Sequence, residues 1–495
     1  MSNVKPHVLV VGGGNAGLTA ALAASDAGAR VTVLERAPLA ERGGDSRFTG
    51  GVWRIAFETP DEIAEIVPGL SAEDRAQIGE LAYGADRFFE DFLRVTGYRC
   101  DPDLAGRVVD ESQATLAWMA RKGARFVAAL GRNVGGDKKM RAWQGTVIES
   151  DGGGPGLIDD LVAACERDGI EIVYGTRAIG LVRDDGGAAR GVRVRAQGRE
   201  RDIASDAVIL ACGGFQADPA RRAQHLGAGW DLAKVRGTRF NTGDGLAMAL
   251  DAGAMTAGNF SGAHAIAFDF NAGEFGDLAR NHVFERHSFH LSLLINRDGK
   301  RFSDEARDFP SYTYASNGRT ILAQPGQMCW QVFDAKVAPL LRDEYRTRHA
   351  SFVQGQTLEE LARAMDGVDE AEMLRTIAAF NAAVPGEPTF DPSVLDGRAT
   401  AGLEPPKSNW ALALDTPPFQ AFPVTCGITF TFGGLKIVAD GGVASADDGV
   451  IPGLYACGEI VGGLYYFNYG AGSGLTSGSV IGRAAAAAAV AYARG

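Results

Sequence analysis

The sequence predicts an α/β protein in which both ends of the 495-residue chain build one domain and the middle forms an inserted α+β domain. Strand-like and helix-like segments alternate to about residue 262, and an apolar strand–glycine pattern returns at about residue 425. Between them, residues 263–424 are richer in aromatic side chains and hold five of the seven histidines. We therefore expect a discontinuous domain at 1–262 plus 425–495, capped by a second domain at 263–424.

The first 35 residues predict a βαβ unit that binds a dinucleotide. The two expected strands and the helix between them span 8–11, 29–34 and 18–27. Gly12, Gly14 and Gly17 form a Gly-x-Gly-x-x-Gly turn after the first strand, and Glu35 ends the second strand. Such glycines permit a tight turn, close approach of a pyrophosphate and close helix packing, while the acid accepts ribose hydrogen bonds. This combination predicts a Rossmann-like nucleotide site.

Further segments resemble the fumarate reductase and succinate dehydrogenase flavoprotein superfamily. Residues 43–51, Gly-Gly-Asp-Ser-Arg-Phe-Thr-Gly-Gly, are similar to its G-G-x-S-x-x-(S/A)-G-G stretch. Residues 207–215 and 453–463 resemble its "VILATGGF" and "GLYAAGE" strands, and residues 241–245 resemble its "TGDG" element. The resemblance implies a Rossmann-like FAD-binding domain with an inserted α+β capping domain, as in fumarate reductase flavoproteins. It also implies an active site between flavin and cap.

The residues expected to contact FAD come from these segments and from one strand near residue 178. They are Gly12, Gly14, Asn15, Ala16, Gly17, Glu35, Arg36, Gly43, Gly44, Asp45, Ser46, Thr49, Gly50, Gly51, Ala178, Ala211, Cys212, Gly213, Thr242, Gly243, Asp244, Gly458, Glu459, Gly474, Leu475 and Thr476. Succinate dehydrogenase has a histidine in the second glycine stretch that bonds covalently to FAD. This chain has no histidine between His7 and His225, so we expect non-covalent FAD that denaturation releases.

The substrate-binding segments depart from those of fumarate reductases. Thr429 and Phe430 replace the histidines of an "HHTMGG" element, and Tyr469 stands near the position of a substrate arginine. These departures resemble the FAD-dependent tricarballylate dehydrogenase family, as do residues 424–437 and 465–483. The resemblance implies oxidation of a carbon–carbon single bond beside a carboxylate. Hydride would pass to flavin N5 and a proton to a side-chain base.

Other chemistries at the same flavin stay open. A flavoprotein half of an aerobic precorrin-3B synthase is also close to this group, so an oxygen-using enzyme is one alternative and a reductase of an enoate is another. A flavin-fold binding protein without turnover is a third, although such a cleft is typical of an active site. The replacement of histidine and arginine by tyrosine, threonine and phenylalanine favours a substrate less charged than fumarate, which counts against tricarballylate itself.

Five residues are candidates for catalysis or substrate binding: His264, Arg307, Thr429, Tyr466 and Tyr469. His264 matches a histidine that holds substrate in fumarate reductases, and a structural role at the domain junction is its alternative. Arg307 is nearest to the proton-donating arginine of those enzymes, but its spacing is one residue short, so a solvated ion pair is the alternative. The hydroxyl groups of Thr429, Tyr466 and Tyr469 would donate hydrogen bonds or merely line the wall.

The overall charge of −12, with no long run of lysine and arginine, excludes a nucleic-acid partner. An anionic small-molecule substrate, which we expect to be a carboxylate, therefore needs a locally basic pocket. Arg236 and Arg239 precede the "TGDG" turn and are candidates for this pocket, with interdomain ion pairs as the alternative.

The six scattered cysteines include no Cys-x-x-Cys pair, so we expect no iron–sulfur cluster, structural zinc or other metal. Together with a start that lacks a leader-like segment, they predict a cytoplasmic protein. The sequence has no second βαβ fingerprint for NAD(P). We therefore expect a separate electron-acceptor protein or a quinone-linked partner.

Overall fold

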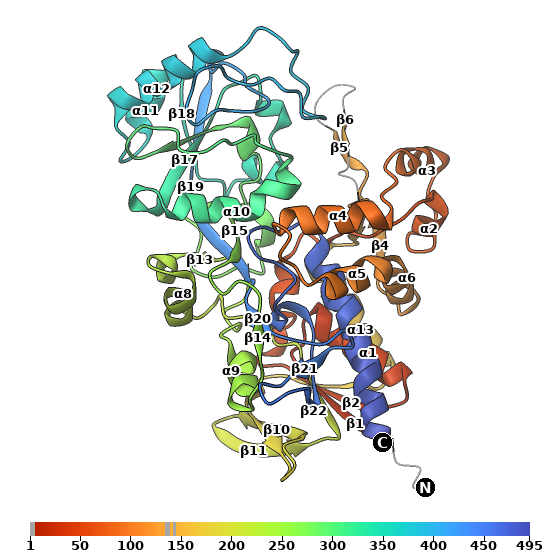
Figure 1. The fold of residues 1–495 in the computed structure, drawn as a ribbon. Helices are drawn as coiled ribbons and strands as arrows, with labels where there is room; N and C mark the ends of the chain where they lie inside the picture. The colour runs from red at the N-terminus through yellow and green to blue at the C-terminus, as the bar shows by residue number, and fades with distance from the viewer. Residues whose placement is uncertain (1–4, 134–138, 142–144) are drawn as a thin grey trace.

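The computed structural model describes residues 5–133, 139–141 and 145–495, and its central sheet lies in the lower half of Figure 1. The expectation that the sequence starts without a leader-like segment rests partly on residues 1–4, which lie outside this range. The sheet has the strand order β21-β22-β12-β1-β2-β8, and all neighbours are parallel except β21 and β22. The strands are β1 (His7–Val11), β2 (Arg30–Leu34), β8 (Glu171–Val173), β12 (Ala207–Leu210), β21 (Gly442–Ala444) and β22 (Val450–Ala456). The predicted α/β class is confirmed.

Two helices from opposite ends of the chain pack together against this sheet. They are α1 (Asn15–Asp26) and α13 (Ser473–Arg494), and α7 (Gly153–Arg167) packs against α1. Their contact is close because it is made by small residues: a Cβ at Gly482 would lie 2.9 Å from the carbonyl oxygen of Ala16. The helices can therefore meet almost backbone to backbone.

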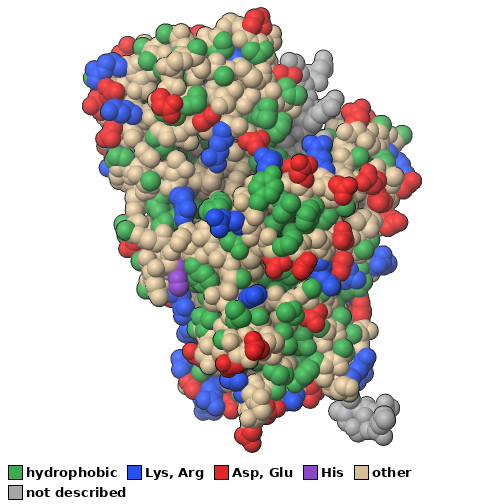
Figure 2. All heavy atoms as spheres, in the orientation of Figure 1, with side chains coloured by type: hydrophobic (Ala, Val, Ile, Leu, Met, Phe, Trp, Pro, Cys, Tyr) green, Lys and Arg blue, Asp and Glu red, His purple; other side chains and the backbone are tan. Residues whose placement is uncertain are grey.

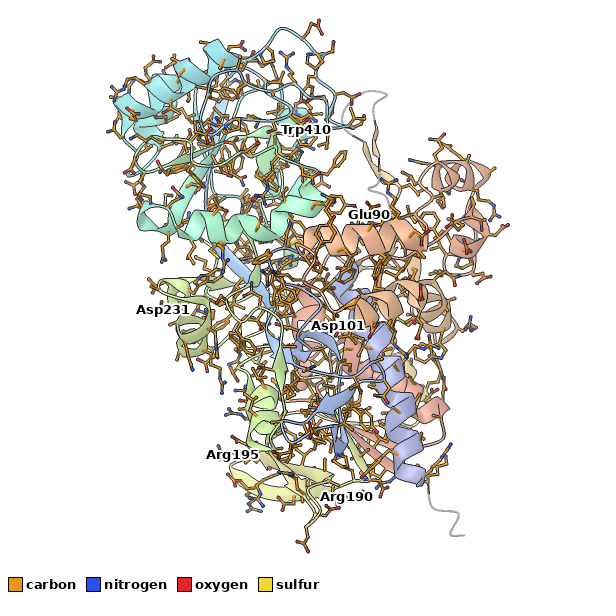
Figure 3. The ribbon with its side chains drawn as sticks, viewed as in Figure 1. Glu90, Asp101, Arg190, Arg195, Asp231 and Trp410 are labelled. Atoms are coloured by element: carbon orange, nitrogen blue, oxygen red, sulfur yellow. The ribbon has the colours of Figure 1, made fainter. Side chains whose placement is uncertain are left out.

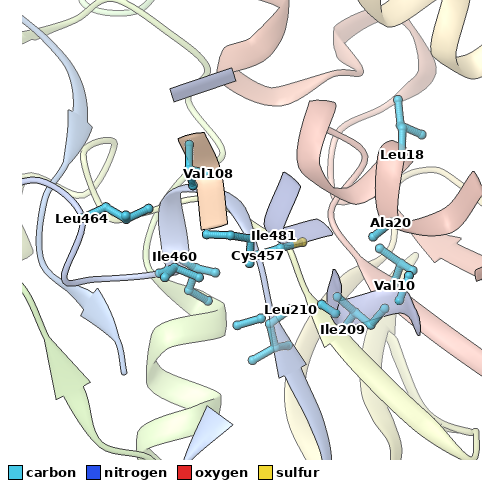
Figure 4. Close-up of a cluster of buried hydrophobic side chains, with 14 of the residues drawn as sticks. Val10, Leu18, Ala20, Val108, Ile209, Leu210, Cys457, Ile460, Leu464 and Ile481 are labelled. Carbon is cyan, nitrogen blue, oxygen red and sulfur yellow. The ribbon is translucent and has the colours of Figure 1, made fainter. Parts of the chain in front are cut away.

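A buried apolar cluster joins the sheet to these helices (Figure 4). Val10 and Ile209 extend from neighbouring strands, Leu18 comes from α1 and Ile481 from α13, and all four are buried. A run of β-branched and aliphatic residues is what a parallel strand covered on both faces requires. The cluster holds the turn after β1 in place beneath the helix that follows it.

Smaller elements surround this core. Helices α2 (Pro60–Ala64), α3 (Ala72–Gly79), α4 (Ala85–Val95), α5 (Pro102–Asp110), α6 (Ser112–Arg121), α8 (Pro219–Leu226) and α9 (Asp244–Asp251) precede the cap. The small sheets use β3 (Val52–Trp53), β4 (Phe126–Ala128), β5 (Gly131–Asn133), β6 (Lys139–Arg141), β7 (Ile148–Ser150), β9 (Arg177–Arg183), β10 (Ala189–Ala196), β11 (Arg199–Ala204), β14 (Thr256–Ala257) and β20 (Gly434–Leu435).

The capping region is built on a second sheet around one long strand, β19, in the upper part of Figure 1. Its strands are β13 (Lys234–Val235), β15 (Ala263–Asp269), β16 (Leu293–Asn296), β17 (Met328–Phe333), β18 (Val353–Gly355) and β19 (Phe419–Thr431). Helix α10 (Pro310–Leu322) packs on β15 and β19, and α11 (Leu358–Ala364) and α12 (Glu370–Ala383) complete the cap. Strand β19 runs across the boundary expected at 424/425, and the exact domain limits stay a prediction.

Acidic and basic side chains are interspersed over the face shown in Figure 2. Figure 3 places Arg190 and Arg195 at the far end of the molecule from the cap, and Trp410 within the cap. Within the described residues, no helix has both the length and the apolar character that crossing a bilayer requires.

Candidate active site

The glycine-rich turn after β1 is tightly constrained by its neighbours. Gly12 has a φ of +113°, and a Cβ there would overlap the carbonyl of Ala211, which follows β12. A Cβ at Gly17 would overlap the carbonyl oxygen of Gly12. Glycine is therefore required at both positions by close backbone approach, and Gly17 acts through helix packing rather than by lining the pocket.

Glu35 points its carboxylate into this turn. Its two oxygens accept hydrogen bonds from the backbone N–H groups of Gly13 (2.8 Å) and Ala37 (2.7 Å). Burial raises the pKa of Glu35, and these N–H groups act in the opposite direction. The side chain is fixed at the wall of the nucleotide pocket, where remaining lone pairs can accept ribose hydroxyls.

An arginine–aspartate cluster closes another side of the same pocket. Arg177 forms a two-pronged ion pair with Asp244, with both N–O distances at 2.7 Å. Arg36 donates to Asp244 at 3.1 Å and to the Thr242 hydroxyl at 2.5 Å. Burial acts to raise the pKa of Asp244, but the two arginines leave it below its usual value. The pocket is thus bounded by groups that hold one another in place.

Two half-buried carboxyls meet where the nucleotide pocket joins a larger cavity. The Gln216 amide donates to Asp45 (2.5 Å) and to Glu459 (3.1 Å). The backbone N–H groups of Thr238 and Thr431 donate to Asp45 and Glu459 at 2.7 and 3.0 Å. Burial raises the pKa of both carboxyls, and the neighbouring Asp45 carboxylate raises the pKa of Glu459 further. We infer that the pair retains a proton at neutral pH.

The larger cavity has a volume of about 790 Å³ and extends from this junction to the cap. Ten predicted residues line only the nucleotide pocket: Gly12, Gly14, Glu35, Arg36, Gly44, Ala178, Ala211, Cys212, Gly213 and Asp244. Three others line only the cavity, on its cofactor side: Thr49, Gly50 and Gly458. Gly474, Leu475, His264, Thr429 and Tyr469 line the cavity as well, and Asn15, Ala16, Asp45, Ser46 and Glu459 line both spaces. The structure thus brings most predicted residues to one continuous space.

Eight predicted residues do not line these two spaces as the described residues define them: Gly17, Gly43, Gly51, Thr242, Gly243, Thr476, Arg307 and Tyr466. Arg307 is exposed and donates to the Ser316 hydroxyl at 2.8 Å, so the solvated alternative matches its surroundings. The Thr476 hydroxyl donates to the Arg54 carbonyl at 2.8 Å. Tyr466 faces away, whereas its neighbour Tyr465 lines the cavity.

Aromatic rings surround His264 at the cavity wall. Ring centroids of Tyr314, Tyr469 and Phe430 lie 5.0, 4.9 and 5.2 Å from the imidazole. Burial, followed by the charges of Arg236 and the His287 ring, lowers the pKa of His264 well below its usual value. Its Nδ1 has no hydrogen-bond partner among the described residues. His264 therefore lines the cavity as a neutral imidazole, and its buried Nδ1 is an unused polar atom.

Tyr469 is held at the start of α13. Its hydroxyl oxygen accepts the backbone N–H of Gly474 at 3.0 Å, which leaves the hydroxyl hydrogen available for another acceptor. Burial raises the pKa of Tyr469, and the N–H groups at the helix start act to lower it. This tyrosine can therefore donate a hydrogen bond into the cavity.

A charged network lies on the cap side, and Arg236 is its one member that the sequence analysis singled out. Glu285 lies 2.5 Å from Arg236, 2.7 Å from His282 and 2.8 Å from His287. Although burial acts to raise the pKa of Glu285, Arg236 and the two histidines hold it well below its usual value. Three histidines and a glutamate within nine residues were the available signal. Tyr314, by contrast, had no motif to mark it.

The residues present fit FAD. The turn at Gly12 and the first turn of α1 form a backbone cradle that a Cβ would fill, as a bound pyrophosphate requires. Gln216 Oε1 and Thr431 Oγ1, beside the cofactor-side wall, have no hydrogen-bond partner among the described residues. Glu35 would hold the ribose, and Thr49, Gly50, Gly474 and Leu475 would pack along the remainder of the cofactor.

Comparison with known proteins agrees with this geometry. The family described as "FAD binding domain" matches residues 7–475. The chain belongs to this family. It is an FAD-dependent oxidoreductase of the fumarate reductase and succinate dehydrogenase flavoprotein superfamily. The predicted cofactor is therefore confirmed.

Two relatives align over nearly the whole chain. Fumarate reductase (cytochrome) from Shewanella frigidimarina is 28% identical, covering 99% of this chain and 78% of the relative. 4-Oxocyclohexanecarboxylate 2-dehydrogenase from Sinomonas cyclohexanicum is 31% identical, covering 98% of this chain and 93% of the relative. The open conformation of a flavocytochrome c3 fumarate reductase has the same fold, with a TM-score of 0.73 at 24% identity over 99% of this chain and 79% of that one.

Replacing Gly12 should remove FAD. In Gly12→Val the new side chain would overlap the Ala211 carbonyl and would need a φ that valine avoids. We expect purified protein with less than about a tenth of the wild-type flavin content, measured by absorbance after denaturation. Gly106→Ala is the control, because a Cβ there meets no atom within 4 Å. Full flavin in the Gly12 variant would contradict the assignment of the turn.

The carboxyl pair of Asp45 and Glu459 should make the FAD-free protein less stable as the pH rises. The folded chain holds protons on Asp45 and Glu459 to higher pH than the unfolded chain does, so rising pH above about 4 favours unfolding. We expect the Tm of apoprotein to fall between about pH 5 and pH 8, and to fall less in Asp45→Asn. Asp447→Asn, an exposed control, should follow the wild type; equal slopes in both variants would refute the pair's role.

Proposed function

We propose that the protein transfers hydrogen across a carbon–carbon bond beside a carboxylate, with tricarballylate as the first candidate substrate. The observation that carries this proposal is a single cavity whose cofactor wall is made of glycine segments and whose cap wall contains three arginines. Arg236, Arg342 and Arg346 line the cap wall. A substrate bound there would meet cationic donors on one side and the flavin-binding segments on the other.

FAD supplies the two-electron redox chemistry when it is bound. The chain must orient the substrate, exclude water and handle the proton. We infer that His264 accepts the proton from carbon in the oxidative direction, because it is neutral, faces the cavity and has an unpartnered Nδ1. Tyr314, Tyr469 and Phe430 enclose this imidazole and keep bulk water from it.

Thr429 and Tyr469 would orient the substrate beside His264. The Thr429 hydroxyl has no hydrogen-bond partner among the described residues. The Tyr469 hydroxyl oxygen accepts the N–H of Gly474, so its hydroxyl hydrogen is not used in that bond. Both side chains line the cavity. Neutral donors in these positions suit a carboxylate or a carbonyl group adjacent to the reacting carbon.

A cyclic oxo acid is the second candidate substrate class. The relative that acts as 4-oxocyclohexanecarboxylate 2-dehydrogenase is 31% identical over nearly the full length of both proteins. The tyrosines around His264 would polarise a ketone, which acidifies the carbon beside it. This class keeps one carboxylate and needs fewer cations than tricarballylate does.

The electron acceptor and the location belong to the same proposal. We expect a separate electron-acceptor protein or a quinone-linked partner, because the sequence has no second dinucleotide fingerprint. The scattered cysteines support a cytoplasmic location. All six cysteines are unpaired in the structure.

Anaerobic mixing with candidate substrates tests the function. We expect tricarballylate to bleach the blue-light absorption band of the flavin in the oxidised holoenzyme, since the reaction moves two electrons to the flavin. 4-Oxocyclohexanecarboxylate is the second compound, and fumarate with dithionite-reduced enzyme tests the reverse direction. If dithionite bleaches the flavin while none of the acids does, and fumarate does not restore it, the proposed substrate classes are wrong.

His264→Asn should slow flavin reduction by about 100-fold or more, because loss of a positioned general base typically costs that much. The rate is measured by anaerobic stopped-flow absorbance at saturating substrate. FAD content should stay near that of the wild type, because His264 lies on the cap strand β15. His349→Asn, which lies outside the cavity lining, should react like the wild type. If the His264 variant reduces its flavin at an unchanged rate, a group other than His264 accepts the proton from carbon.

A further inference from the structure

The cap wall of the cavity contains two segments that are tied together through Ser288. One segment leads into the short helix η5 (Phe289–Leu291), and the other leads into η8 (Asp343–Tyr345). The Ser288 hydroxyl accepts the backbone N–H of Arg342 at 3.1 Å, and the Tyr345 hydroxyl accepts the backbone N–H of Ser288 at 3.0 Å. His290 and Arg342, which both line the cavity, are therefore held in a fixed relation.

His290 is buried, and among the described residues its ring has no well-aligned hydrogen bond, since the His287 carbonyl beside it is a poorly aligned acceptor. The residue is 4% exposed. Neither Nδ1 nor Nε2 has a hydrogen-bond partner of good geometry among the described residues. The ring packs edge-on against Trp410, with centroids 5.3 Å apart, within the cap shown in Figure 3. A buried imidazole with two unsatisfied nitrogens is costly unless something in the cavity completes its hydrogen bonds.

Two cations act on this imidazole. Arg342 lines the cavity, and its Nε lies 3.3 Å from Glu344 without a hydrogen bond of good geometry. Lys407 is buried and donates to the Ser292 carbonyl at 2.6 Å. Burial first, then Lys407 and Arg342, lowers the pKa of His290 to about 3. The ring is therefore neutral in a locally positive environment, which favours an anion in the adjoining part of the cavity.

We propose that Arg342 and His290 form a binding site for a substrate carboxylate remote from the reacting carbon–carbon bond. This inference rests on the proposed function and specifies its substrate class: acids with a second carboxylate, or oxo acids whose carboxylate lies away from the ketone. Arg342 supplies the charge, and the neutral imidazole supplies one N–H donor. Thr429 and His264, which also line the cavity, serve the other end of the substrate.

Binding to the oxidised holoenzyme tests this site without turnover. The probes are tricarballylate and butyrate, which lacks the additional carboxylates, and the signal is the shift of the flavin absorption band. We expect Arg342→Gln to reduce the preference for tricarballylate over butyrate by about 10- to 100-fold, as loss of a charged hydrogen bond does. His290→Phe should reduce it by about 3- to 10-fold. Arg348→Gln removes the same charge from the same segment outside the cavity lining and should change nothing.

Flavin content and Tm report whether each variant is folded. Arg342→Lys keeps the charge and should recover part of the lost preference, which a merely structural role of Arg342 would not produce. If wild type is bleached by tricarballylate but Arg342→Gln and His290→Phe bind it as the wild type does, the remote site is wrong and the proposed function stands. If tricarballylate and 4-oxocyclohexanecarboxylate neither bind to the wild type nor bleach it, both proposals fall.

Discussion

The parallel pairing of β12 with β1 on one side and β22 on the other is the constraint on which the site depends. Val8 pairs with Ala207, and Val208 pairs with Leu454, so three strands from distant parts of the chain end at one sheet edge. The glycine turn, the turn after Ala211 and the turn before Glu459 therefore converge there. In α/β sheets such an edge is where ligands bind. A Cβ at Gly12 would overlap the Ala211 carbonyl, which shows how little space separates the turns.

The cap reaches this edge through one long strand. Strand β19 pairs with β15 so that His264 faces Phe430 across the sheet, with a register shift immediately after His264. Such irregularities re-aim side chains near functional sites. Because β19 also carries Thr429 and Thr431, a single strand positions groups for the cofactor side and for the substrate side. Movement of the cap sheet would therefore displace both sets of groups together.

The sequence predicted what is encoded locally and missed what is assembled by folding. The motif at Gly12 and the stretch at 43–51 depend on backbone conformation, which a short sequence specifies. Arg307 was placed by spacing on a loop, where one residue turns a side chain from the cavity to solvent. Tyr466 illustrates the same sensitivity, since Tyr465 beside it faces the cavity instead. Arg342 had no signal, because a loop without a motif brings it to the wall.

The charge distribution of the cavity reconciles an observation from the sequence with one from the structure. Loss of the histidines and arginine near the flavin suggested a weakly charged substrate, yet the cavity contains three arginines on its cap wall. The charge of Arg236 is engaged by Glu285 at 2.5 Å, whereas Arg342, among the residues that the structure describes, has a poorly aligned ion-pair partner in Glu344 at 3.3 Å. Under the proposed function, cationic recognition would therefore lie at the cap end of the substrate rather than at its reacting end. The reacting bond would then lie among His264, Tyr469 and other uncharged groups, where a low local dielectric would strengthen each hydrogen bond to developing charge.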